Sequence, residues 1–236
     1  MDNKLNIISK PSPNFGERKN NTKPHIIVIH YTAMRNAREA LRLLRDPKSE
    51  VSSHYLIDET GQIFSLVREH YRAWHAGVGK WRGCEDINSS SIGIELCNSG
   101  KSPYSFLLFN ALLNLVKIVK DRWSIDKINV IGHSDLAPNR KKDPGRHFDW
   151  RALELHGLAT EVQMDETNDD FWSNLEKIGY HVPNSNSYRN DLLEAFRSRY
   201  CPENFGYLNS RDIIIACGIA KNLKFSDYLC SNTSCG

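Results

Sequence analysis

The apolar residues of this chain fall into short runs with two different periodicities. Residues 26–29 are continuously apolar, which is typical of a strand buried on both faces, and residues 127–131 are predicted to form a second buried strand. Residues 91–97 alternate, with three aliphatic side chains on one face and a glycine, a glutamate and a cysteine on the other. Residues 53–57 and 62–67 are shorter strand candidates, and the turn residues between them predict a hairpin.

Apolar residues at helical spacing predict five helices. They cover residues 36–45, 103–123, 170–178, 187–200 and 210–221. Ser102 is expected to cap the longest of them, with Pro103 in its first turn. The pattern therefore predicts an α/β fold, in which a central mixed β-sheet is flanked by helices and followed by a small C-terminal three-helix domain.

Two histidines stand where buried strands should end. His30 closes the first apolar run, His133 follows the run at 127–131, and Asp143 comes ten residues after His133. Two imidazoles and one carboxylate form a three-ligand zinc set that leaves a fourth coordination position open for water. Ligands carried on strand ends are held rigidly. If the three side chains converge, the sequence predicts a zinc hydrolase.

A glutamate within an otherwise apolar strand is a further chemical signal. Burial of Glu95 is costly unless its carboxylate has a partner or a task, so it is either a general base or one half of an ion pair. In an extended segment, Lys141 and Asp143 would project to the same side and place an ammonium beside the metal ligand. The alternative is a solvated basic loop, which we accept for Lys142 and Arg146.

Six segments of the chain together resemble the zinc-dependent N-acetylmuramoyl-L-alanine amidases of type 2, the AmpD/AmiD family. They are IHYTA at 29–33, SHYLI at 53–57, AWHAG at 73–77, SIGIE at 91–95, GHSD at 132–135 and KKDPG at 141–145. The resemblance covers roughly residues 20–158, and its motifs occur in the family's order.

This resemblance implies a site and a reaction. It implies one Zn²⁺ held by His30, His133 and Asp143, with Glu95 as the base and Lys141 as the stabiliser of the oxyanion. The implied reaction is hydrolysis of the amide between N-acetylmuramic acid and L-alanine. Its substrate would be bacterial peptidoglycan or a soluble muropeptide, in cell-wall turnover or recycling.

Four further residues are candidates for contact with substrate: His54, Trp74, His75 and Asn98. The two histidines lie in segments shared with the family, and a structural or substrate-lining role fits them better than metal ligation. The indole of Trp74 could form an apolar wall for a sugar or peptide, or it could belong to the core.

Two other function classes are compatible with parts of this sequence. A peptidoglycan-recognition protein shares the architecture but lacks a zinc ligand and only binds; the complete ligand set together with Glu95 disfavours it. A glycosidase needs two carboxylates flanking a sugar, and only Glu95 is placed for such chemistry. Zinc dependence separates the amidase from the glycosidase, because paired carboxylates work without a metal.

The chain is predicted to divide into four parts. They are an irregular N-terminal lead-in at 1–23, the zinc amidase domain at 24–160, a helical domain at 168–225 and a C-terminal tail at 226–236. An acidic stretch at 165–170 is expected to be a linker or the entry to a helix. The helical part resembles the small peptidoglycan-binding domain that often follows this amidase, and a packing extension without a ligand of its own is the alternative.

Composition narrows the partners. The 236 residues carry a formal net charge of +3, too small an excess to predict nucleic-acid binding. The basic excess lies before residue 165, where it could favour anionic wall material. Six cysteines without a C-x-x-C pair argue against a second zinc site, and a Cys230–Cys235 disulfide requires an oxidising compartment.

The sequence gives conflicting signals about location. No apolar run approaches the roughly 20 residues of a membrane span, and residues 1–15 contain no export signal. Taken literally, this predicts a cytoplasmic protein, whereas a wall-binding domain favours the bacterial periplasm or envelope. A monomer is expected.

Overall fold

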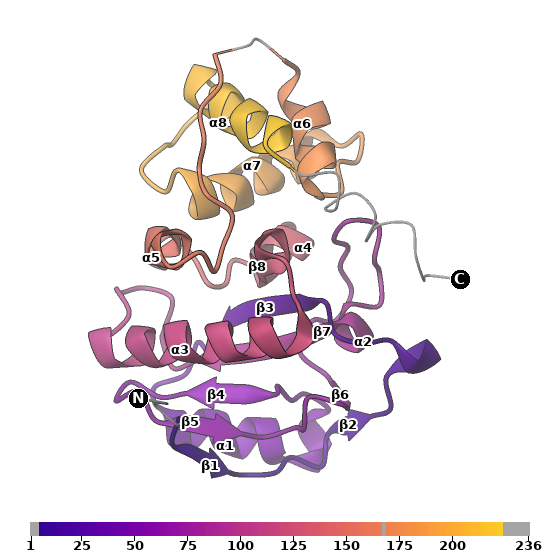
Figure 1. Ribbon diagram of the computed structural model, residues 1–236, viewed down its shortest axis with the longest axis vertical. Helices are drawn as coiled ribbons and strands as arrows, with labels where there is room; N and C mark the ends of the chain where they lie inside the picture. Colours follow the sequence, from indigo (N-terminus) through magenta and orange to yellow (C-terminus); the bar gives the residue numbers. More distant parts are fainter. Residues whose placement is uncertain (1–4, 167–168, 224–236) are drawn as a thin grey trace.

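The computed structural model describes residues 5–166 and 169–223, and its centre is a six-stranded mixed sheet (Figure 1). The strand order is β1-β5-β4-β7-β3-β8, and among these described strands only β4 and β5 pair in the antiparallel direction. The strands are β1 (Ile7–Ser9), β3 (Ile26–Tyr31), β4 (Tyr55–Ile57), β5 (Ile63–Ser65), β7 (Ser91–Leu96) and β8 (Val130–Gly132). A separate two-stranded sheet joins β2 (Phe15–Gly16) to β6 (Arg72–Ala73).

Helices cover both faces of the large sheet (Figure 1). On one face lies α3 (Phe106–Trp123), whose buried Leu112 packs in one cluster with Ile29 of β3. On the other face α1 (Ala37–Arg45) packs against Leu56 of β4. Because side chains alternate along a strand, the face of β3 that is turned away from α3 carries His30.

Three C-terminal helices complete the fold and share a core with the sheet. They are α6 (Phe171–Ile178), α7 (Asn186–Tyr200) and α8 (Ser210–Lys221). Their buried side chains, such as Phe196, form one continuous apolar cluster with Val28 of β3 and with Trp81. The helical unit is therefore packed onto the sheet by the hydrophobic effect rather than joined to it only by a linker.

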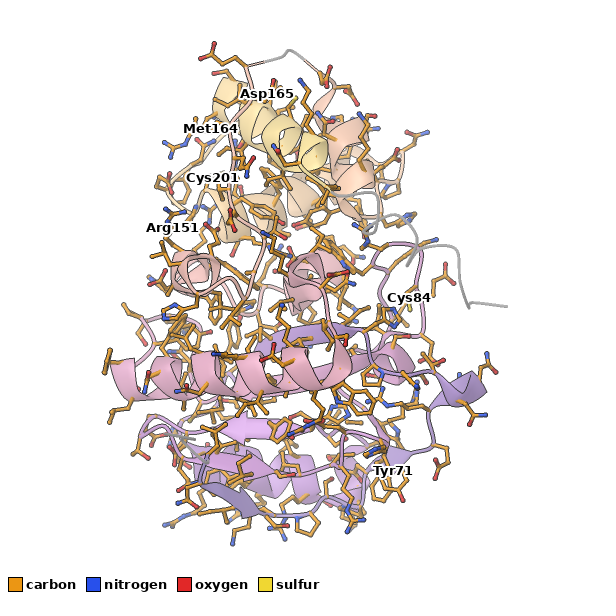
Figure 2. The ribbon with its side chains drawn as sticks, in the orientation of Figure 1. Tyr71, Cys84, Arg151, Met164, Asp165 and Cys201 are labelled. Carbon is orange, nitrogen blue, oxygen red and sulfur yellow. The ribbon has the colours of Figure 1, made fainter. Side chains whose placement is uncertain are left out.

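Short helical segments complete the connections. They are α2 (Ile87–Ser90), α4 (His133–Leu136) and α5 (Trp150–Leu155), with 3₁₀ turns at Lys19–Asn21, Pro47–Ser49 and Lys127–Asn129. The segment after α5 runs along the helical unit, and Figure 2 labels Met164 and Asp165 beside α8. The backbone N–H of Asp165 donates to the carbonyl of Ile214 at 3.0 Å. The first residue of the predicted acidic linker is thus hydrogen-bonded to α8.

The three predicted C-terminal helices and the predicted helix at 36–45 are confirmed to within one residue at each end. The longest helix differs, because it begins at Phe106, and Ser105 caps it by accepting the N–H of Leu108 at 3.2 Å. The carbonyl of Ser102, the predicted cap, instead accepts from the side chain of Asn98 at 3.2 Å. The helix therefore begins three residues later than predicted.

Two strand predictions also differ from the structure. Within the predicted strand at 127–131, Lys127–Asn129 forms a 3₁₀ turn, closed by the Asn129 N–H donating to the Asp126 carbonyl at 2.9 Å. The predicted irregular lead-in contributes β1 and β2. Strand β1 forms because the free edge of β5 supplies backbone partners in parallel register, which residue periodicity does not reveal.

Several sequence expectations concern absences or pairings. Within the described ranges, no helix is long and apolar enough to cross a bilayer. The described cysteines are buried thiols: Cys84, Cys97, Cys201 and Cys217. Figure 2 places Cys84 and Cys201 on different parts of the fold. The predicted tail at 226–236 and the Cys230–Cys235 pair lie outside the described residues.

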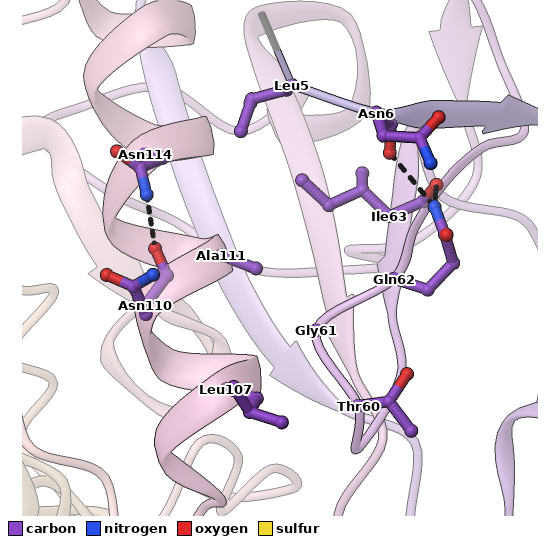
Figure 3. Close-up of a pocket in the computed structure, with 10 residues that line it drawn as sticks. All are labelled: Leu5, Asn6, Thr60, Gly61, Gln62, Ile63, Leu107, Asn110, Ala111 and Asn114. Carbon is purple, nitrogen blue, oxygen red and sulfur yellow. Dashed lines mark hydrogen bonds between the residues drawn. The ribbon is translucent and has the colours of Figure 1, made fainter. Parts of the chain in front are cut away.

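A pocket of about 380 Å³ lies where α3 meets the turn between β4 and β5 (Figure 3). The side-chain amides of Gln62, Asn110 and Asn114 contribute to its wall. The turn approaches α3 so closely that a Cβ on Gly61, which has a φ of +85°, would lie 2.6 Å from the carbonyl oxygen of Leu107. The lining of this pocket includes none of the predicted metal or catalytic residues.

Candidate metal centre

The three predicted ligands converge at one edge of the sheet. His30 is the penultimate residue of β3, His133 begins α4 directly after β8, and Asp143 lies in the loop that follows. Parallel strands β3 and β8 are neighbours, so their carboxyl ends bring the two histidines together. The Nδ1 atoms of the two rings are 2.9 Å apart, and Asp143 Oδ2 lies 2.9 Å from His30 Nδ1 and 3.1 Å from His133 Nδ1.

This triangle of atoms fits a metal ion better than it fits hydrogen bonds alone. Two ring N–H groups can donate to the carboxylate, but the contact between the two Nδ1 atoms would then set one donor against another. Ligands at about 2.0–2.1 Å from a tetrahedral zinc are separated by roughly 3.3 Å, close to the observed spacing. All three side chains are buried, with 2%, 2% and 7% of their surfaces exposed. A cation would use the three lone pairs together.

The electrostatics favour the ligating forms of these groups. Burial, with a smaller contribution from His133, lowers the pKa of His30 to about 4 and keeps its ring neutral. Burial alone would raise the pKa of Asp143, but its contacts with the imidazoles of His133 and His30 outweigh burial and hold the pKa below its usual range. The centre therefore offers neutral imidazole and ionised carboxylate, as zinc requires.

Glu95 lies beside this triangle. It is the register partner of His30 on the neighbouring parallel strand β7, so both side chains project from the same face. Its Oε2 atom is excluded from solvent and has no hydrogen-bond partner among the described residues. Burial and the nearby charge of Asp143 raise the pKa of Glu95 to about 8, and Lys141 partly opposes this shift. A carboxyl group tuned to this range can accept and release a proton near neutral pH.

Comparison with known proteins identifies the family. Residues 20–146 match the Amidase_2 family of N-acetylmuramoyl-L-alanine amidases. The chain belongs to this family.

Two curated relatives illustrate the relationship of this amidase-family chain. The N-acetylmuramoyl-L-alanine amidase AmiD of Escherichia coli K12 is 38% identical over 159 residues, which cover 61% of this chain and 56% of AmiD. The 1,6-anhydro-N-acetylmuramyl-L-alanine amidase AmpD of Haemophilus influenzae is 34% identical over 157 residues, covering 59% of this chain and 85% of that protein. The chain thus spans just over half the length of AmiD and most of AmpD.

Solved structures extend the similarity beyond the amidase domain. Escherichia coli AmiD, in complex with anhydro-N-acetylmuramic acid-L-Ala-D-gamma-Glu-L-Lys, superposes with a TM-score of 0.75 at 30% identity and covers 88% of this chain and 97% of that one. AmpDh3 from Pseudomonas aeruginosa has a TM-score of 0.76 at 30% identity and covers 89% of this chain and 94% of that one. Such coverage must include part of the C-terminal helices.

The other predicted site residues of this family member have distinct surroundings. His54 is fully buried; its Nδ1 accepts the Gly93 N–H at 2.9 Å, and its Nε2 donates to the Tyr71 carbonyl at 3.1 Å. Burial and the Arg18 guanidinium lower the pKa of His54 to about 3. Both ring nitrogens are therefore committed to the backbone, which favours the structural role for this residue.

Trp74 and Asn98 lie on loops that border the sheet edge. The backbone N–H of Trp74 donates to Ser52 Oγ at 2.9 Å, and the residue is partly exposed. Asn98 Oδ1 accepts the Gly100 N–H at 2.7 Å, and its Nδ2 donates to the Ser102 carbonyl. The Asn98 side chain thus stabilises its own loop, while Trp74 keeps a surface that a ligand could contact.

The sequence singled out His75 for a structural or substrate-lining role, but it did not reveal the contact of this residue with His30. His75 Nδ1 lies 3.0 Å from His30 Nε2, and its own Nε2 lies 3.1 Å from Ser91 Oγ. Gly93 passes beneath the ring, and a Cβ at that position would lie 2.5 Å from His75 Cγ. A glycine inside a predicted strand is a known mark of such a close approach, but Ser91 carries no comparable signal.

Proposed function

We propose that this chain is a zinc-dependent N-acetylmuramoyl-L-alanine amidase that hydrolyses the amide between N-acetylmuramic acid and L-alanine. The observation that carries the proposal is the buried set of His30, His133 and Asp143 with the unpartnered carboxyl oxygen of Glu95 beside it. The names of the relatives support a substrate that contains muramic acid and L-alanine. Peptidoglycan and soluble muropeptides both contain this bond.

Zinc is the proposed metal because of the donor set. Imidazole nitrogen and carboxylate oxygen are ligands of catalytic zinc, whose sites use three protein ligands and keep a position open. The bound ion would supply Lewis acidity, which polarises a carbonyl and makes water more acidic. Two buried histidines, of which His30 has a pKa lowered to about 4, and an ionised aspartate match this requirement.

The chain's own residues would handle the proton and the developing charge. Glu95 would take the proton of the attacking water at its unpartnered Oε2 and return it to the nitrogen of the departing L-alanine. The ammonium of Lys141 would stabilise the negative charge that develops on the carbonyl oxygen, and loss of such a group typically costs about 10²–10³ in rate. Lys141 is close enough to influence the pKa values of both His30 and Glu95.

The experiment is digestion of purified peptidoglycan and of an anhydro-muramyl tripeptide, with products identified by mass spectrometry. We expect free stem peptides that begin at L-alanine, loss of this product on chelation, and its recovery when zinc is restored. Asp143→Ala is the matched negative control. Wall binding without peptide release by zinc-loaded protein would contradict the proposal and favour a recognition protein. Release of sugars that persists under chelation would favour a glycosidase.

A further inference from the structure

A chain of hydrogen bonds leads away from the metal centre through His75. His30 Nε2 lies 3.0 Å from His75 Nδ1, His75 Nε2 lies 3.1 Å from Ser91 Oγ, and this hydroxyl donates to the Ile87 carbonyl at 2.6 Å. The last acceptor is a backbone carbonyl, which cannot donate. The Ile87 carbonyl therefore fixes the direction of donation along this series of hydrogen bonds.

The same direction follows from the metal end. If His30 offers the lone pair of Nδ1 to zinc, its Nε2 carries the proton and must donate it. His75 then accepts at Nδ1 and donates from Nε2 to Ser91, whose hydroxyl donates onward to Ile87. His75 and Ser91 each accept one hydrogen bond and donate one, so a single tautomer of each histidine satisfies the whole series of hydrogen bonds.

The neighbouring residue orients the other histidine ligand. His133 Nε2 lies 2.9 Å from the carbonyl oxygen of Ala76, which can only accept, so the ring proton is on Nε2 and Nδ1 is left for the metal. The backbone N–H groups of His75 and Ala76 both donate to Asn88 Oδ1, at 3.1 and 2.9 Å. Two consecutive residues, clamped by one amide, thus contact the outer nitrogens of both histidines.

We propose that the His75–Ala76 pair, held by Asn88, is the element that orients both zinc-binding histidines, and that His75 is a positioning residue rather than a substrate contact. The proposal rests on the zinc function proposed above. Outer hydrogen-bond partners of metal-bound histidine fix its tautomer and ring direction, and their loss typically costs about 10–100-fold in metal affinity or activity. Of these two contacts, that of His75 comes from a side chain and that of Ala76 from the backbone, so His75 is the partner that mutation can remove.

The test compares two amide substitutions that retain different parts of the ring. His75→Asn places an oxygen near the position of Nδ1 and can still accept from His30, whereas His75→Gln places its amide near Nε2 and cannot. Zinc affinity is measured by competition with a chromophoric chelator, and the absorption spectrum of the cobalt-substituted protein reports the ligand geometry. We expect about 10–100-fold weaker zinc binding in His75→Gln, a shifted cobalt spectrum, and near wild-type values in His75→Asn.

Matched variants keep the result interpretable. His156→Gln alters an exposed histidine at the end of α5, whose ring contacts the Ala152 carbonyl, and we expect it to leave zinc affinity within about threefold, below the range for an outer partner. Ser91→Ala removes the next acceptor and should weaken zinc binding less than His75→Gln does. Unchanged zinc affinity in His75→Gln, with a raised KM, would overturn the inference in favour of substrate contact. Failure of the wild-type protein to bind zinc or to release peptide would instead overturn the proposed function.

Discussion

Two buried polar clusters lie close together in this protein: Asp135 with Arg199 and Tyr180, and His30 with His133 and Asp143. The described contacts satisfy the donors and acceptors of the first cluster but not those of the second. Asp135 is 2% exposed; its Oδ2 accepts from the Gly132 N–H at 2.7 Å and from Arg199 Nη1 at 2.9 Å, and its Oδ1 accepts from the Tyr180 hydroxyl at 2.7 Å. His133, two residues before Asp135, belongs to the second cluster with His30 and Asp143, where one contact joins two ring nitrogens.

The difference teaches how to distinguish a structural cluster from a site. Arg199 also donates to the Val130 carbonyl at 2.8 Å and stacks on the rings of Trp150 and Tyr200, at 4.8 and 4.9 Å. Its charge and donors are used within the fold, as a buried ion pair requires. At the metal centre, by contrast, the unpartnered oxygen of Glu95 and the opposed ring nitrogens call for a cation and a proton from outside the chain.

The comparison also explains why the helical unit matters to the amidase domain. Arg199 lies on α7 and Tyr180 lies two residues after α6, while Asp135 lies in α4, two residues after the proposed ligand His133. The Ser134 N–H in turn donates to the Asp143 carbonyl at 2.9 Å. This connection supports the view that the helices stabilise the fold around the site, alongside any role in wall binding.

The largest effect should come from removing a metal ligand. Asp143→Ala leaves two histidines, and we expect loss of bound zinc together with a fall in activity beyond the 10–100-fold that loss of an outer partner typically costs. Elemental analysis of the purified variant and the peptide-release assay measure the two quantities. Full zinc occupancy in the variant would remove Asp143 from the centre.

Removing the proposed base should separate chemistry from metal binding. Glu95→Gln keeps the shape of the side chain, so we expect zinc content to stay at the wild-type level while turnover falls by roughly 10²–10⁴. Metal analysis and single-turnover rates with the same muropeptide test this. Turnover near the wild-type rate would assign proton transfer to another group.

Removing the Arg199 cation, which pairs with Asp135, should lower the stability of the fold rather than change the chemistry of the site. Arg199→Met keeps the apolar stem but leaves the buried Asp135 carboxylate unpaired, which should lower the free energy of unfolding by about 3–5 kcal/mol. Arg211→Met, in an exposed ion pair with Glu203, is the control and should cost less than about 1 kcal/mol. Denaturant unfolding measures both.

A double variant sharpens this test. Combining Arg199→Met with Asp135→Asn removes the unpaired charge, so part of the lost stability should return. If the double variant is no more stable than Arg199→Met alone, the loss comes from packing rather than from an orphaned carboxylate.

The smallest effect concerns the pH dependence of the metal-free protein. The pKa of Glu95 is raised from 4.5 to about 8, so between these values the folded state holds a proton that the unfolded state has lost. The stabilisation from this group is therefore full below about pH 4.5 and declines as pH rises toward 8, by up to about 1.4 kcal/mol per pH unit. The free energy of unfolding is measured across this range for wild type and Glu95→Gln. The decline that Glu95 causes should be present in the wild type and absent from Glu95→Gln.

Titration of the buried histidines affects the pH dependence of unfolding in both proteins alike. Burial lowers the pKa of His30 to about 4 and that of His54 to about 3, so both destabilise the fold as pH falls below 6.5. That slope has the opposite sign and is common to the two proteins. Parallel curves for wild type and Glu95→Gln would mean that Glu95 is ionised in the folded state.

The sequence by itself determined the chemistry of the site to a large extent. The apolar runs marked most of the central strands, and residues that follow neighbouring parallel strands lie at one edge of the sheet. This is why His30, His133 and Asp143 converge, and why alternation in two adjacent strands puts Glu95 beside His30. The roles of these residues follow from this placement and stay predictions to be tested by the variants above.

Only the tertiary structure decided which distant groups are partners. Arg199 meets Asp135 across 64 residues, and His75 meets His30 across 45, through loops whose paths depend on packing. Strand β1 exists because β5 offers a free edge, and α6–α8 share a core with β3 although their own periodicity predicts only three amphipathic helices. Periodicity reports which face of an element is buried; the partner on that face is chosen by the shape and charge of the whole fold.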